Sequence, residues 1–75
     1  MKASDEMRKR ISDLRSTILR ATNEGKGLDE KKTVAYLSIE WGLTERKLKD
    51  YIKQLKNANL IYYKDDLIWS NERNE

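Results

Sequence analysis

Residues 34–61 read VAYLSIEWGLTERKLKDYIKQLKNANLI, and this stretch decides the fold. In its first part Val34, Leu37 and Trp41 recur at helical spacing, which predicts one buried face of a helix. Gly42 then favours a tight turn, because glycine adopts left-handed backbone conformations without steric cost. A second apolar stripe at helical spacing follows, so the stretch predicts two helices joined by a short turn.

These two helices are expected over residues 30–41 and 45–58, because Asp29 and Thr44 are residue types that cap helix N-termini. The second helix has a buried stripe of apolar positions: Leu48, Tyr51, Ile52 and Leu55. Asn59 is placed to end it, since asparagine tolerates the left-handed conformation in which many helices stop.

A longer helix is expected earlier, over residues 4–24, with Ser4 as its N-cap. Its apolar stripe comprises Met7, Ile11, Leu14, Ile18 and Ala21. Gly25 and Gly27 are expected to end this helix.

The pattern changes after the last of these helices. Two short runs, LIYYK and LIWS, are rich in isoleucine, tyrosine and tryptophan and are separated by Asp65 and Asp66. They predict a β-hairpin over residues 60–69 with a tight turn, although Asp-Asp is not a favoured turn pair. Residues 70–75 are expected to form a polar tail that frays.

Length and charge set the broad class. The chain has 75 residues, so residues 1–75 are expected to form a single α+β domain with a thin core. Its 16 basic and 13 acidic residues leave a formal charge of only +3, which does not by itself identify a partner. No apolar leader or membrane-spanning run is present, so we expect a cytoplasmic protein without membrane contact. The lack of cysteine and the 39% of charged residues also fit a protein from a hot environment.

The residue types that carry most enzyme chemistry are absent. The chain has neither histidine nor cysteine, the commonest acid–base and nucleophilic groups. The segment Gly25-Lys26-Gly27 lacks the rest of a phosphate-binding loop. Adjacent Asp65 and Asp66 are typical of turn residues rather than of a metal site. We therefore expect no catalysis, cofactor or metal, and too little volume for a small-molecule pocket.

The order helix, helix, tight turn, helix, hairpin has a counterpart among known proteins. The residues that carry the match are Leu37, Ser38, Trp41, Gly42, Leu43, Thr44, Leu48, Ile52, Leu55, Asn59, Leu60 and Ile61. Their spacing resembles that of winged helix-turn-helix DNA-binding regulators, especially small bacterial and archaeal ones, including those of archaeal plasmids and viruses. The family commonly has alanine where Ser38 stands and glycine where Asn59 stands. The resemblance implies three helices followed by a two-stranded β-hairpin wing, and regulation of transcription through double-stranded DNA.

The third predicted helix carries its charge opposite its apolar stripe. From Thr44 to Lys56 it has five basic and two acidic residues, and five minus two is +3. A face of this kind suits the major groove, which is lined by phosphates and admits an α-helix. The expected DNA-contacting residues here are Thr44, Glu45, Arg46, Lys47, Lys49, Asp50 and Lys53.

Within this set the roles are expected to differ. Arg46 is the best candidate for a bidentate contact to guanine, and Lys53 for a phosphate contact. Glu45 or Asp50 is expected either to accept from a cytosine amine or to discourage loose binding. The candidates outside this helix are Lys31, Lys32 and Thr33, at a helix N-terminus, and Tyr62, Tyr63 and Lys64, in the hairpin.

Each of these residues also has a plainer interpretation. Lysine-rich helix faces are commonly just solvated surfaces, and a lysine beside a turn, such as Lys64, often has no binding role. Trp41 and Trp69 sit at apolar positions and are expected to be core residues. A protein-interaction module and non-specific nucleic-acid binding therefore remain as alternative functions.

Two apolar groups are not explained by the core. Met7 and Ile11 are expected to project past a compact three-helix body. Ala35, Tyr36 and Ile39 point away from the buried face of their own helix. Either these surfaces cover each other or they meet a second copy, and we expect a homodimer, at least on DNA, that forms through the N-terminal helix.

Overall fold

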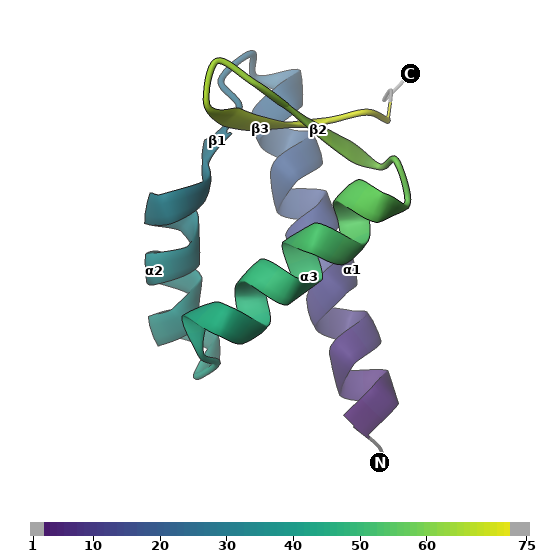
Figure 1. Cartoon of the computed structure of the whole chain (residues 1–75), viewed down its shortest axis with the longest axis vertical. Coiled ribbons are helices and arrows are strands. Elements are labelled where there is room, and N and C mark those ends of the chain that lie inside the picture. Colours follow the sequence, from purple (N-terminus) through teal and green to yellow (C-terminus); the bar gives the residue numbers. More distant parts are fainter. Residues whose placement is uncertain (1–2, 73–75) are drawn as a thin grey trace.

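The computed structural model describes residues 3–72, which form a small α+β domain. In chain order its elements are α1 (Ala3–Asn23), β1 (Leu28–Asp29), α2 (Glu30–Trp41), α3 (Glu45–Asn57), β2 (Ile61–Lys64) and β3 (Leu67–Ser70). Figure 1 shows α3 crossing in front of α1, α2 to one side, and the β2–β3 hairpin at the top, in front of the C-terminal end of α1. Over these residues, no helix has the length and apolar character needed to cross a membrane.

The helix ends follow from local chemistry. The carboxylate of Asp29 accepts from the N–H of Lys32 over 3.0 Å, and the hydroxyl of Thr44 accepts from the N–H of Lys47 over 3.1 Å. Both expected N-caps are therefore confirmed. Ser4, by contrast, lies inside α1, which begins one residue earlier, and its side chain is outside the described part.

The C-terminal ends of α1 and α3 share one backbone arrangement. Beyond α1, Gly25 has φ +75 and the N–H of Lys26 donates to the carbonyl of Ala21 over 3.0 Å. Beyond α3, Asn59 has φ +62 and the N–H of Leu60 donates to the carbonyl of Leu55 over 3.0 Å. In both cases the left-handed residue turns the chain so that the N–H of the next residue reaches a carbonyl in the last turn of the helix. This is the role expected for Gly25 and Asn59.

The turn between α2 and α3 is closed by two residues. Gly42 has φ +67 and its N–H donates to the carbonyl of Ser38 over 3.0 Å. The hydroxyl of Ser38 donates to the carbonyl of Leu43. This side chain therefore stabilises the turn.

The core draws on every helix and on both hairpin strands. Its buried members are Leu14, Ile18, Val34, Leu37, Leu48, Tyr51, Ile52, Leu55, Ile61 and Ile68. The apolar stripes expected for α2 and α3 are confirmed. Trp41 packs against this core, but Trp69 is only half-buried and is not part of it, so the expectation for Trp69 was wrong.

The sheet has three strands rather than the two expected. Its order is β1-β3-β2, all antiparallel, with Leu28 opposite Ile68 and Asp29 opposite Leu67. A two-residue strand gives no readable period, which is why β1 was missed. In the hairpin turn Asp65 and Asp66 have φ +55 and +64, the signs that a two-residue hairpin turn favours.

The expected polar tail does not begin at residue 70. Ser70 is buried at the end of β3, and its N–H donates to the hydroxyl of Thr22 on α1 over 2.7 Å. Glu72 then pairs with Arg15, at 2.7 Å from Oε2 to Nε, and the guanidinium lowers the pKa of the Glu72 carboxyl. Residues 73–75 lie outside the described part. The end of β3 and Glu72 are therefore joined to α1 through the side chains of Thr22 and Arg15.

Candidate nucleic-acid interface

The exposed face of α3 gathers most of the cations expected to contact DNA. Leu48, Tyr51, Ile52 and Leu55 hold the opposite face in the core, which sets the rotation of the helix about its axis. One shallow concave surface, here called the basic surface, is lined by Thr44, Arg46, Lys47, Lys49, Asp50 and Lys53. Four cations and one carboxylate give it a formal charge of 4 − 1 = +3.

The side chains of the basic surface differ in how far they are already engaged. The hydroxyl of Thr44 caps the helix, and Oδ2 of Asp50 accepts from Nε2 of Gln54 over 3.3 Å. Among residues 5–72, Arg46 and Lys53 form no ion pair with an acidic side chain. Both cations are exposed and available to an anionic partner.

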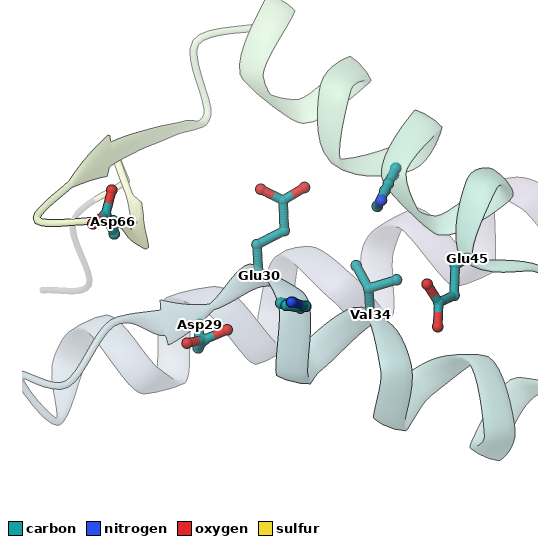
Figure 2. Close-up of a pocket in the computed structure, with 7 residues that line it drawn as sticks. Asp29, Glu30, Val34, Glu45 and Asp66 are labelled. Atoms are coloured by element: carbon teal, nitrogen blue, oxygen red, sulfur yellow. The ribbon is translucent and has the colours of Figure 1, made fainter.

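A second concave surface lies between the hairpin tip and the N-terminal ends of α2 and α3. This acidic surface is lined by Asp29, Glu30, Lys31, Val34, Glu45, Lys49 and Asp66. Figure 2 shows Glu30 pointing into the space between the hairpin, which carries Asp66, and α3, which carries Glu45. Two cations and four carboxylates give it a formal charge of 2 − 4 = −2.

Among the residues that the structure describes, no three acidic side chains are arranged to hold a metal ion. Lys49 lines both surfaces, so a cationic and an anionic surface adjoin along one side of α3.

Tyr63 connects the hairpin to α2. Its hydroxyl donates to Oε1 of Glu30 over 2.9 Å, and Nζ of Lys56 lies 5.4 Å from the centre of its ring. Burial, together with the hydrogen bond to Glu30 and the charge of that carboxylate, raises the pKa of Tyr63 to about 12. The hydroxyl expected to contact DNA is therefore used within the domain.

The other hairpin candidates lie on a different face. Tyr62 and Lys64 pair with Trp69 and Leu67 of β3, and side chains alternate between the faces of a strand, so both point away from the Tyr63 side. Nε1 of Trp69 donates to the carbonyl of Lys64 over 3.1 Å. The structure does not bring Tyr62 or Lys64 onto the basic surface.

The candidates at the start of α2 are close to acidic groups. Lys31 and Lys32 are exposed and Thr33 is half-buried in the first turn. The carboxylate of Asp29 already accepts from an N–H of this turn. A phosphate at this helix end would therefore share it with a carboxylate.

Among the α3 candidates, Glu45 alone does not line the basic surface and lines only the acidic surface. It also places Asp29, Glu30 and Asp66 near the interface, and sequence reasoning did not assign these residues to it. Their meeting depends on the pairing of Asp29 with Leu67 in the sheet, for which the sequence has no local signal.

The two unexplained apolar groups have different outcomes. Ile11 packs against the core beside Leu55 and Leu60, so the expectation that it projects past the body was wrong. Met7 is 37% exposed and is not among the residues that pack against the core. Tyr36 and Ile39 remain 62% and 83% exposed on α2, so this face is uncovered in the single chain.

Comparison with known proteins returned no match: no family model, no curated protein and no solved structure resembles this chain closely enough to be identified.

Proposed function

We propose that this chain is a winged helix-turn-helix protein that binds double-stranded DNA sequence-specifically and regulates transcription. The layout supports this proposal: α2 is followed by a three-residue turn closed by Gly42 and Ser38, then by α3, and then by the β2–β3 hairpin. In this proposal α3 enters the major groove, and catalysis plays no part.

The observation that carries the proposal is the basic surface on a helix with a fixed rotation. A helix with its side chains is about 10–12 Å across, which fits a major groove about 12 Å wide. Because the core holds four residues of α3, the cations of its other face present a fixed pattern to the groove. Such a pattern is what base recognition requires, beyond simple attraction to phosphate.

Within the interface we assign the base contact to Arg46 and a phosphate contact to Lys53. Arg46 lies in the first turn of α3, the part that meets base edges in this docking geometry. Lys53 lies two turns further along, where the helix approaches the sugar–phosphate backbone. Asp50 is placed between them, and it either accepts from a cytosine amine or disfavours other bases.

The proposed protein partner is a second copy of the chain. The two copies meet on DNA through the exposed Tyr36 and Ile39 of α2. The same exposed pair is the observation that favours the second candidate function, a protein-interaction module.

The deciding experiment is selection of bound sequences from a random duplex pool, followed by the stoichiometry of the complex on the enriched site. We expect one enriched sequence that random duplex displaces poorly. Uniform, steeply salt-dependent binding to all duplexes would instead identify a non-specific nucleic-acid binder. Absence of binding even at low salt would reject DNA binding and favour the protein-interaction module.

A further inference from the structure

The acidic surface stands directly beside the surface proposed to bind DNA. Lys49 belongs to both, with Arg46 and Lys53 on one side of it and Glu30 and Asp66 on the other. The formal charge changes from +3 to −2 from one surface to the next, as counted above. Any duplex seated on α3 therefore lies close to four carboxylates.

These carboxylates are held in place. Asp29 is tied to the hairpin by its pairing with Leu67, and Glu30 by its bond from Tyr63. Lys56 lies over the Tyr63 ring on the α3 side. The hairpin that carries Asp66 is therefore joined to the start of α2 and contacts α3.

A helix seated in the major groove has a phosphate strand along each of its sides. On the side of α3 that bears Glu45 and Lys49, that strand would run toward the acidic surface. A phosphate and a carboxylate repel each other when they lie within the screening length, which is about 8 Å at physiological salt.

From this juxtaposition we infer that Asp29, Glu30 and Asp66 of the acidic surface, together with Asp65 beside Asp66 in the hairpin turn, form an electrostatic barrier that keeps duplex phosphates off the hairpin. Contact with DNA is then confined to the basic surface of α3. The inference rests on the proposed function and deepens it. The barrier lowers the affinity for every duplex, because it acts on phosphates, and leaves discrimination to the bases that α3 reaches.

The test removes the two negative charges of the hairpin tip and compares the effect on affinity with that of the same charge change elsewhere on the domain. Asp65→Asn/Asp66→Asn removes two negative charges, and asparagine tolerates the left-handed backbone of this turn. The matched control, Asp5→Asn/Glu24→Gln, also removes two negative charges, at exposed positions that line neither surface. Affinities are measured for the selected duplex and for random duplex, at low and at high salt.

We expect the tip variant to bind both duplexes about tenfold more tightly than wild type at low salt, and the control about twofold, with both gains shrinking at high salt. Lys64→Ala should change affinity less than about twofold, because the hairpin stays off the DNA. A tip variant that gains no more than the control, or that binds more weakly than wild type, would overturn the barrier while leaving DNA binding intact. If neither wild type nor the tip variant binds any duplex at low salt, the proposed function fails, and the barrier with it.

Discussion

The hydroxyl of Tyr63 donates a hydrogen bond to the carboxylate of Glu30 over 2.9 Å and so joins β2 to the first turn of α2, 33 residues away in the chain. The bond places a hairpin residue and a helix residue on one surface. It has consequences for stability as well as for the approach of a ligand.

The first prediction concerns stability at high pH. The pKa of Tyr63 is raised to about 12 in the folded chain, above the ordinary value of 10.0. The protonated Tyr63 hydroxyl therefore contributes its full share of the folding stability below about pH 10. That contribution is lost as the pH rises through about 12. Because the side chain is 41% exposed, we expect the loss to be about 1 kcal/mol, less than the full linkage value.

Denaturant unfolding of wild type and Tyr63→Phe between pH 8 and pH 12 measures this effect. The gap between the two unfolding free energies should narrow as Tyr63 ionises. Tyr62→Phe, which leaves the bond to Glu30 in place, serves as the control and should follow wild type. Parallel curves for wild type and Tyr63→Phe would contradict the prediction.

The second prediction compares two glycines with nearly the same backbone. Gly27 has φ +68 and Gly42 has φ +67, but a Cβ on Gly27 would lie 2.9 Å from Cε2 of Trp69, whereas one on Gly42 meets nothing within 4 Å. Gly42→Ala should lower the free energy of unfolding by about 1 kcal/mol, from backbone strain alone.

Gly27→Ala should cost about 2–4 kcal/mol, because the Trp69 ring must also move and Nε1 of that ring is bonded to the carbonyl of Lys64. Urea denaturation of the two variants separates strain from crowding. An equal loss of unfolding free energy in the two variants would show that the Trp69 ring moves aside at no energetic cost.

The third prediction distinguishes base contacts from phosphate contacts. Arg46→Ala should cost about 1–3 kcal/mol on the selected duplex and relax the preference at one base pair. Lys53→Ala should weaken all duplexes alike and reduce the salt slope by about one unit. Lys9→Ala, an exposed lysine on α1, is the control and should change little. Equal losses of Arg46→Ala on selected and random DNA would argue against base recognition.

The fourth prediction concerns self-association. Ile39 is 83% exposed, so Ile39→Lys should leave folding intact while placing a charge on the proposed contact between copies. Two exposed side chains offer far less than the roughly 800 Å² per partner of a stable interface, so we expect the pair of chains to form on DNA rather than in free solution. Ile39→Lys should reduce the stoichiometry on a palindromic site from two chains to one.

Sedimentation with and without duplex measures this change, with Ser16→Lys on exposed α1 surface as the charge-matched control. Ile11→Lys is a poor test, because Ile11 packs against the core and its replacement would also destabilise the fold. An unchanged stoichiometry for Ile39→Lys would reject this face as the contact.

The sequence by itself determined the three helices and their ends, except for the start of α1, where Ser4 lies inside the helix. Caps and stops act over a few residues, so Asp29, Thr44, Gly42 and Asn59 could be assigned without a structure. The apolar stripe of α3 likewise determined which face the cations occupy. Arg46 and Lys53 were therefore placed on the exposed side of α3 from periodicity alone.

Only the tertiary structure decided what lies around that face. Strand β1 is two residues long and has no period to read, yet its pairing with β3 places Asp29 and Glu30 near the hairpin tip. The bond from Tyr63 to Glu30 likewise joins positions that share no local pattern. Charge on one helix follows from sequence order, whereas the meeting of charges from separate elements depends on how those elements pack.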